Sequence, residues 1–465
     1  MDNLHKLTLK EAREGLLSKK FTAVELTQSC LDRIKTLEKK LNSFVTVTSD
    51  EALKQAQSAD ISLPLGGIPL AVKDNYLTVA LRTTASSKVL DKYIAQYDAT
   101  TIVKLKNAGA IIIGKTNMDA WAHGSSTETS DYGPTLNPWN VEHLPGGSSG
   151  GSAAATAADE TIISVGSETA GSIRQPASWC GVVGFKPTYG RVSRYGVIAM
   201  KSSTDSPGPI CKTVDDAASL LEIMSGNDLH DATSINEVPW IRPELRQNLN
   251  GLKIGLPTCY FSKETQSEVR DAILKAVETL KKLGAEVVEL TNVLDPKYSI
   301  AVYTILQRSE VSSNLARFDG IRYGHDRSFF GQEAKRRIML GTYSLSAGYY
   351  DAFYLKAQKV RTLICRDFDN QFEKVDAIIG PVSPTTALKC GASEGQSMFG
   401  EIQDMLVEPS SIAGLPGISI PCGFDKIGLP IGLQIITPQR REDLVYQIAK
   451  LFEDNTEYYL SRPKL

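Results

Sequence analysis

The sequence predicts an α/β fold in which helices cover a mainly parallel or mixed β-sheet. Helix-like and strand-like segments alternate along the 465 residues, with 42% hydrophobic and 22% charged residues. Because no linker rich in proline, serine and glycine separates independent blocks, we expect one domain spanning 1–465. No internal repeat or low-complexity tract interrupts the alternation.

The elements follow one another in a regular order. Thr22 and Glu25 form a capping box that starts a helix, and 43–47 reads as the strand behind it. The segment 63–75 reads as a buried strand that ends at Lys73. A helix followed by a strand then recurs in three pairs: 99–109 with 110–114, 269–284 with 285–290, and 361–372 with 375–381.

The segment Gly109–Thr116, "GAIIIGKT", matches the phosphate-loop pattern letter by letter. A phosphate loop needs a strand before it, flexible middle residues and a helix that begins at the lysine. Here a helix precedes it, and three of the four middle residues are isoleucines, which favour strands. We therefore reject a nucleotide site and expect a helix end, a strand and a turn.

Charge and cysteine usage restrict the function classes. The 51 basic and 53 acidic residues give a net charge of −2, which argues against an autonomous nucleic-acid binder. No apolar run is long enough to span a membrane, and Glu11 and Glu14 are atypical of a targeting sequence. Seven scattered cysteines without a C-x-x-C pair favour the cytoplasm and give no metal-ligand pattern.

Two serines with glycine neighbours, Ser148 and Ser172, lie in the segment 145–177, which contains no histidine. A hydrolytic serine needs a base to take its proton. His123 and His143 are the nearest histidines, but neither has an acid at a diagnostic spacing, so we expect structural roles for both.

Lys73 offers a different base. A lysine at the end of a buried strand is desolvated, which disfavours its charged form. The alternative is a strand-end lysine that extends to water, and composition alone favours that alternative.

The contexts "GIPLAVKDN" of Lys73, "PGGSSGGSAAA" of Ser148 and "GSETAGSIRQPAS" of Ser172 closely resemble the amidase signature family. The resemblance covers nearly the whole chain, with the signature core at about 63–215, and implies a mixed sheet with helices on both faces. It implies that Ser172 is the nucleophile of an acyl-enzyme mechanism, Ser148 the bridging serine and Lys73 the base. It also implies a cis peptide bond before Ser148.

The turn before the nucleophile should hold the oxyanion. In this resemblance the backbone N–H groups of Thr169, Ala170, Gly171 and Ser172 face the developing negative charge. The family usually has two glycines before the serine, whereas this chain has Ala170 and Gly171. If the first position requires a positive φ, alanine there is strained by about 1 kcal/mol, so we expect a slightly altered turn.

Three segments of the second half, 312–324, 335–363 and 414–424, resemble one branch of this family: the A subunits of glutamyl-tRNA(Gln)/aspartyl-tRNA(Asn) amidotransferases. That resemblance implies that the substrate is glutamine and that the B and C subunits are partners in a heterotrimer. Mischarged tRNA is contacted mainly through the B subunit. The chain itself needs no cofactor or metal, and ATP and Mg²⁺ belong to the partner's amidation step.

The same resemblance assigns the amino-acid end of glutamine to three residues. Arg337 should bind the α-carboxylate and Asp404 the α-ammonium, with Tyr303 as a weaker candidate in the same pocket. The segment 325–334 is shorter than is usual, which points to an altered pocket mouth or partner contact.

Two alternatives stay open at this point. A stand-alone amidase for a small or aryl amide would need neither Arg337 nor Asp404. A non-catalytic scaffold would not require Lys73, Ser148 and Ser172 together. The sequence does not distinguish Glu-tRNA(Gln) from Asp-tRNA(Asn), and it does not reveal the route by which ammonia leaves.

Overall fold

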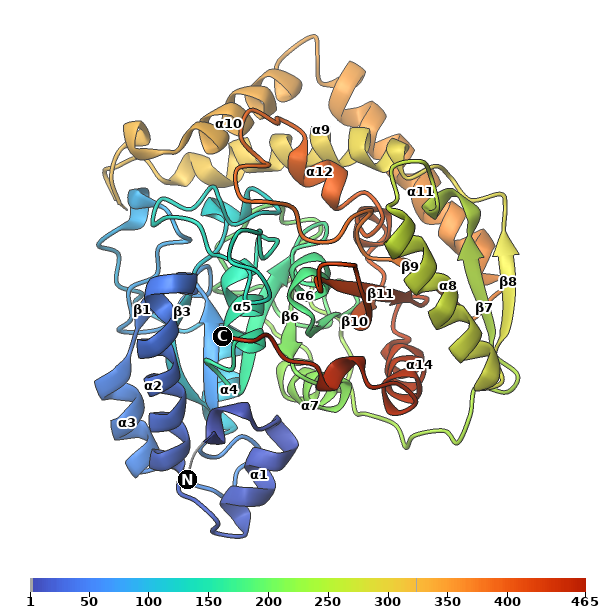
Figure 1. Ribbon diagram of the computed structural model, residues 1–465. Coiled ribbons are helices and arrows are strands. Elements are labelled where there is room, and N and C mark those ends of the chain that lie inside the picture. Colours follow the sequence, from blue (N-terminus) through green and yellow to red (C-terminus); the bar gives the residue numbers. More distant parts are fainter. Residues whose placement is uncertain (1–2, 323) are drawn as a thin grey trace.

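The computed structural model describes residues 3–322 and 324–465; residue 323, within the predicted similarity segment 312–324, lies outside the described residues. Within the described part, eleven strands form one mixed sheet in the order β1-β3-β2-β4-β6-β5-β10-β11-β9-β7-β8 (Figure 1). Parallel pairing joins β2 to β3 and β4, and β7 to β8 and β9; the other neighbours are antiparallel. The predicted α/β class with a mixed sheet is confirmed.

The strands are short and mostly buried. They are β1 (Phe44–Val47), β2 (Pro69–Lys73), β3 (Ile111–Thr116), β4 (Ile163–Glu168), β5 (Val183–Lys186), β6 (Ser206–Cys211), β7 (Lys253–Pro257), β8 (Glu286–Leu290), β9 (Ala377–Pro381), β10 (Gly417–Phe424) and β11 (Pro430–Ile436).

The α-helices occupy most of the remaining chain. They are α1 (Leu9–Leu17), α2 (Ala23–Leu41), α3 (Ser49–Gln57), α4 (Thr100–Asn107), α5 (Gly150–Ala157), α6 (Arg174–Cys180), α7 (Val214–Met224), α8 (Ser267–Lys282), α9 (Lys297–Asn314), α10 (Gln332–Leu345), α11 (Lys356–Phe372), α12 (Phe399–Gln403), α13 (Glu408–Ile412) and α14 (Glu442–Asp454).

Helices cover both faces of the sheet. Successive side chains of a strand point to opposite faces. In β6, Ile210 packs with residues of α5 and α6, whereas the next residue, Cys211, packs in the large core that includes α7 and α14. At one end of the molecule α9 lies against α10 and α11. These three helices, at the top of Figure 1, are called the roof below.

The local predictions agree with these elements. Helix α2 begins after the Thr22 and Glu25 capping box, in which each side chain accepts a hydrogen bond from the other residue's backbone N–H. In the rejected phosphate-loop segment, β3 continues through Lys115, whose Nζ lies 3.3 Å from Asp74 Oδ1. The lysine therefore belongs to a buried ion pair inside a strand, and the rejection is confirmed.

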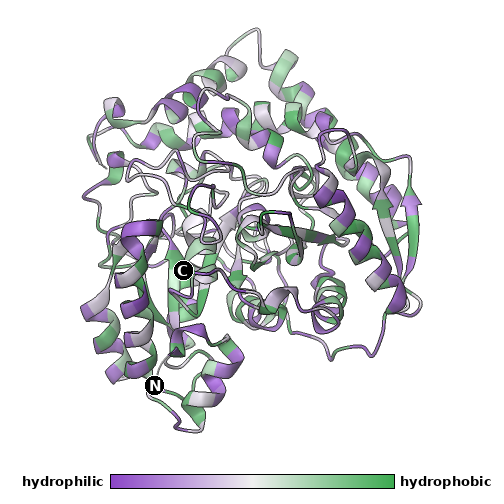
Figure 2. Ribbon diagram, in the orientation of Figure 1, coloured by the Kyte–Doolittle hydropathy of each residue, from purple (hydrophilic) through white to green (hydrophobic). Residues whose placement is uncertain are grey.

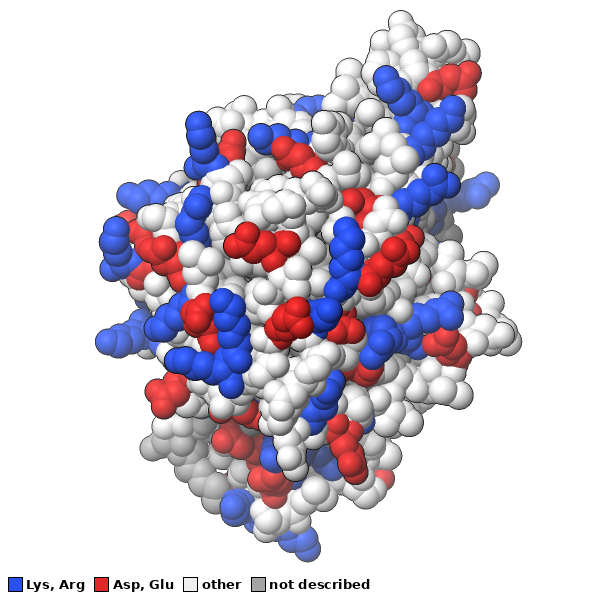
Figure 3. Space-filling model, turned by 90° about the vertical axis from the view of Figure 1, so that its right-hand side faces the viewer, with Lys and Arg blue, Asp and Glu red and all other residues white. Residues whose placement is uncertain are grey.

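Hydrophobic and charged residues occupy different parts of the molecule. Hydrophobic residues gather along the sheet and the inner sides of the helices (Figure 2). On the face shown in Figure 3, basic and acidic side chains are interspersed and no broad basic field appears. Within the described ranges, no helix has the length and apolar character needed to cross a membrane.

Candidate active site

Lys73, the last residue of β2, is completely buried. Its Nζ donates to Ser148 Oγ and Ser149 Oγ, each at 2.8 Å, and to the Ser167 carbonyl oxygen at 3.0 Å. Burial lowers the pKa of Lys73 to about 7, although three acidic residues at longer range act in the opposite direction. The predicted desolvation of this lysine is confirmed, and the lysine contacts the predicted bridging serine directly.

The serine segment lies close against the loop after β3. The peptide bond between Gly147 and Ser148 is cis, and α5 begins two residues later. A Cβ at Gly147 would lie 2.1 Å from Asp119 Oδ2, so glycine is needed for this close approach. The Ser149 N–H donates to the Ser172 carbonyl oxygen at 3.2 Å. The structure therefore brings the glycine-flanked segments of Ser148 and Ser172 together beside Lys73.

A buried ion pair fixes the turn that carries Ser172. Glu168 Oε2 accepts the N–H groups of Ile173 and Arg174 at 3.0 Å each, and Glu168 Oε1 lies 2.6 Å from Arg174 Nη2. Arg174 Nη1 also donates to Ser410 Oγ at 3.0 Å and to Gln434 Oε1 at 3.2 Å. The turn is thus anchored at its end to α13 and β11.

The backbone donors of this turn are free. Among the described residues no acceptor is found for the N–H groups of Thr169, Ala170, Gly171 and Ser172. Ala170 is not among the described non-glycine residues with positive φ. The condition for strain at Ala170 is therefore not met, and the Ala170 carbonyl instead accepts a hydrogen bond from Ser411 Oγ at 2.5 Å.

Asp404 lies directly against the turn. A Cβ at Gly171 would come within 2.4 Å of Asp404 Oδ1, so the carboxylate occupies the space that a side chain there would take. Ser125 Oγ donates to Asp404 Oδ2 at 2.8 Å, whereas Oδ1 is buried without a described partner. Burial raises the pKa of Asp404 well above its usual range. The carboxylate that the resemblance assigned to the α-ammonium is therefore adjacent to the predicted nucleophile.

Arg337 and Tyr303 come from the helices of the roof, α10 and α9, and both are buried. Arg337 Nε donates to Glu333 Oε1 at 2.5 Å, and its Nη2 lies 3.9 Å from Glu401 Oε1. Burial alone would lower the pKa of Arg337, but the two glutamates outweigh burial and raise it. Arg337 and Asp404 both interact electrostatically with Tyr303, which places the three in one region.

Sequence reasoning missed four further buried charged residues of this region, which also contains His123, for which a structural role was expected. Arg308 Nη2 pairs with Glu401 Oε1 at 2.7 Å, and His123, whose pKa burial lowers well below its usual range, faces Arg308 and Arg337. Lys201 Nζ lies 5.4 Å from the Tyr303 ring centroid, and Glu408 is completely buried. No sequence pattern marks these charged residues as buried, because charged residues are usually exposed at the surface.

The shortened segment 325–334 packs onto the same region. It contains a short 3-10 helix, η6 (Arg327–Phe329), and the start of α10. The Phe330 ring is buried, with its centroid 5.4 Å from that of Trp121, and the ring of Phe318 lies 4.8 Å from Trp121 on the same cluster. The segment therefore contributes Phe330 to a cluster of packed aromatic rings in this structure.

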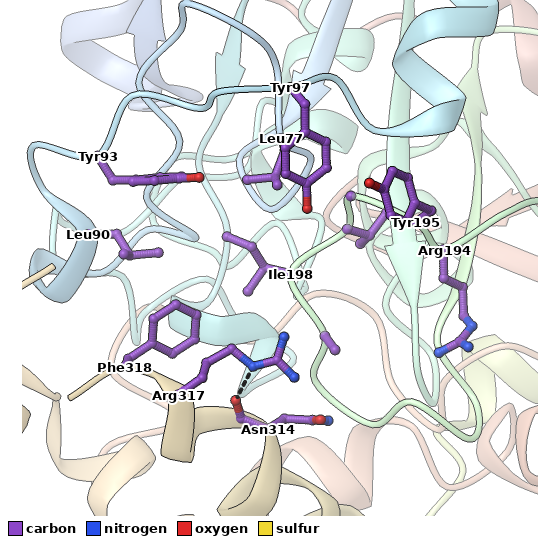
Figure 4. A pocket seen from close by; sticks show the side chains of 13 residues that line it. Leu77, Leu90, Tyr93, Tyr97, Arg194, Tyr195, Ile198, Asn314, Arg317 and Phe318 are labelled. Carbon is purple, nitrogen blue, oxygen red and sulfur yellow. Dashed lines mark hydrogen bonds between the residues drawn. The ribbon is translucent and has the colours of Figure 1, made fainter. Parts of the chain in front are cut away.

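A separate cavity of about 410 Å³ lies beside the loop after β2 (Figure 4). Tyrosines and Leu77 line one side, and Arg317 on the other side donates from Nε to the Asn314 carbonyl oxygen at 3.0 Å. A smaller adjoining cavity reaches Ser167 and Asp205. None of the predicted site residues lines the larger cavity, but the smaller one reaches Ser167, whose carbonyl oxygen accepts a hydrogen bond from Lys73.

Comparison with known proteins places this geometry in context. The model of the Amidase family matches residues 25–446. The A subunit of glutamyl-tRNA(Gln) amidotransferase from Carboxydothermus hydrogenoformans is 48% identical over 99% of this chain and 100% of the relative, and that of Nostoc sp. is 47% identical over 98% and 99%.

Solved structures are also similar to this chain over nearly its whole length. The crystal structure of the A subunit of glutamyl-tRNA(Gln) amidotransferase from Thermotoga maritima superimposes with a TM-score of 0.85 at 40% identity, over 100% of this chain and 99% of that one. The 6-aminohexanoate cyclic dimer hydrolase has a TM-score of 0.90 at 26% identity, with 100% and 99% covered.

Proposed function

This chain belongs to the Amidase family, and we propose that it is the glutamine-hydrolysing, ammonia-generating subunit of a tRNA-dependent amidotransferase. The observation that carries the proposal is the contact of a buried lysine of lowered pKa, Lys73, with Ser148, beside the turn of Ser172. The full-length similarity to the A subunits of glutamyl-tRNA(Gln) amidotransferases supports the choice of substrate.

The catalytic cycle begins with neutral Lys73. As Ser172 Oγ attacks the side-chain amide carbon of glutamine, its proton passes to Ser148 and the Ser148 proton passes to Lys73 Nζ. The tetrahedral intermediate then breaks its C–N bond, and the proton returns along the same path to the leaving nitrogen, which departs as ammonia. Water hydrolyses the resulting ester of Ser172, releases glutamate and restores the serine. The pKa of Lys73 at about 7 suits a group that must both accept and return a proton near neutral pH.

The oxyanion would bind at the turn before the nucleophile. The N–H groups of Thr169, Ala170, Gly171 and Ser172 are free to donate, and the Glu168–Arg174 pair holds their backbone in place. Loss of one such donor typically costs about 3 kcal/mol of transition-state stabilisation.

Two residues of opposite charge would select glutamine over a neutral amide. Arg337 would bind the α-carboxylate and Asp404 the α-ammonium, and Tyr303, which interacts electrostatically with both, would lie in the same pocket. Asp404 lies against Gly171, so an ammonium bound there is close to the reacting serine.

The remaining steps would take place in partner subunits. The B subunit would bind the mischarged tRNA and use ATP and Mg²⁺ for amidation, and the C subunit would join the other two. The nearly balanced charge of this chain fits a protein that leaves most tRNA contact to its partner. A cytoplasmic location follows from this role, and the seven free cysteines fit a reducing compartment.

Ammonia release tests the proposal. The chain, co-purified with its B and C subunits, is given glutamine or a neutral aryl amide, and Ser172→Ala is the blank. Glutamine turnover that disappears in Ser172→Ala, with little aryl-amide turnover, is the expected result. Aryl-amide turnover without glutamine turnover would instead identify a stand-alone amidase, and no turnover of either would favour a scaffold.

A further inference from the structure

Two oppositely charged side chains beside Tyr303 are completely buried without a hydrogen-bond partner in the described part of the chain. They are Lys201, through Nζ, and Glu408, through both carboxylate oxygens. Each interacts electrostatically with the other, and Lys201 Nζ lies 5.4 Å from the Tyr303 ring centroid. Buried polar groups are normally hydrogen-bonded, so this pair has unused hydrogen-bonding capacity that a bound polar ligand could fill.

Glu408 stands one helical turn after Asp404. The Glu408 N–H donates to the Asp404 carbonyl oxygen at 2.8 Å, and residues four apart on a helical turn project from the same side. Asp404 Oδ1 also lacks a described partner and lies against Gly171. Two carboxylates with free oxygens thus lie together next to the nucleophile turn.

The charges of this region pair off except at these carboxylates. Arg308 pairs with Glu401 at 2.7 Å, and Arg337 pairs with Glu333 at 2.5 Å. Asp404 accepts only the hydroxyl of Ser125, and no described group donates to Glu408. Lys201 and Arg308 both oppose the effect of burial on the pKa of Glu408, but no described group donates a hydrogen bond to Glu408 Oε1, Glu408 Oε2 or Asp404 Oδ1.

We propose that Glu408 is a second carboxylate of the substrate pocket, which binds the α-ammonium group of glutamine together with Asp404. Lys201 is a positioning residue whose positive charge opposes the effect of burial, which raises the pKa of Glu408 well above its usual range. This inference rests on the proposed glutaminase function and deepens it, because it makes the ammonium group, shared by two carboxylates, the main determinant of substrate choice.

The test compares glutamine with 4-carbamoylbutanoate, which is the same molecule without the α-amino group. In the complex with the B and C subunits, Glu408→Gln should raise KM for glutamine about tenfold or more, as expected for loss of a charged hydrogen bond. The kcat for glutamine and the KM for 4-carbamoylbutanoate should change less than about threefold. Glu160→Gln is the matched control, because Glu160 is equally buried without a described partner but lies near Glu38, away from the pocket.

Lys201→Met provides an independent variant should Glu408→Gln fail to fold. Loss of the lysine raises the pKa of Glu408, so KM for glutamine should rise with KM for the analogue unchanged. Its effect should be less than additive with that of Glu408→Gln, since both act on one carboxylate.

Several results would overturn the inference: an unchanged KM for glutamine in both variants, equal changes for the two substrates, or a lower kcat at constant KM. The affinity of the Ser172→Ala complex for glutamine, measured by calorimetry, separates this inference from the proposed function. If glutamine binds and Glu408→Gln weakens it about tenfold, the subsite stands even if the wild type releases no ammonia. If glutamine does not bind, both proposals fail.

Discussion

Lys73 and Lys115 occupy neighbouring parallel strands, one residue apart in register, and both are completely buried. Both Nζ atoms donate to hydroxyl and carbonyl oxygens, but Lys115 Nζ also lies 3.3 Å from the carboxylate of Asp74. Burial lowers the pKa of both lysines, but at Lys115 the first opposing influence is a carboxylate in contact. The partner, and not the burial, therefore separates a lysine able to act as a base from a structural cation.

The largest expected difference between the two lysines is in activity. Lys73→Met should reduce ammonia release from glutamine by at least about 10³-fold, because it removes the general base. The double variant Lys115→Met/Asp74→Asn, which removes the neighbouring ion pair as a unit, should keep kcat within about threefold for the folded fraction. Equal losses in the two variants, measured by ammonia release and circular dichroism, would contradict this assignment.

The next effect is on stability. Asp74→Asn leaves Lys115 as an unpaired buried charge and should lower the free energy of unfolding by about 3 kcal/mol. Urea denaturation of the purified complex measures this change, with kcat followed at low urea. A variant as stable as the wild type would show that Lys115 does not depend on its carboxylate.

A substitution can also place a carboxylate next to Lys73, as Asp74 lies next to Lys115. Ser149→Asp places a carboxylate in contact with Lys73 Nζ, which should raise the pKa of Lys73 from about 7. Because the base must be neutral, activity rises with pH through this pKa. The rise should move up by at least about one pH unit, and activity at pH 7 should fall at least about fivefold.

The uncharged variant Ser149→Asn is the control for this experiment, because it has nearly the same size and should leave the midpoint near the pKa of about 7. A pH profile of kcat/KM that is identical for the two variants would show that Lys73 is not the titrating base.

The smallest effect is expected for loss of the Ser149 hydroxyl, the second of the two hydroxyls at Lys73. Ser149→Ala removes one acceptor but leaves the path through Ser148, so kcat should fall only about threefold to tenfold. Ser148→Ala should reduce kcat by at least about 10²-fold, since the proton path is broken. The reverse order in single-turnover ammonia release would make Ser149 the bridging serine.

The sequence was sufficient for several of the elements and for the three motifs. Capping at Thr22 and the helix–strand order predicted α2, β2 and β3, because local signals determine such elements. The contacts of Arg308 with Glu401, 93 positions later, and the burial of Glu408 were missed, since a charged residue is buried only when distant chain segments supply its surroundings. The single domain of 1–465 stays a prediction.

The anchoring of Arg174 has a consequence for synthesis on the ribosome. The nucleophile turn is held by Ser410 and Gln434, residues that leave the ribosome long after the turn itself. A nascent chain that already contains Lys73, Ser148 and Ser172 therefore lacks the contacts that order the turn. We therefore expect the nucleophile turn to become ordered only when translation of the chain is almost complete.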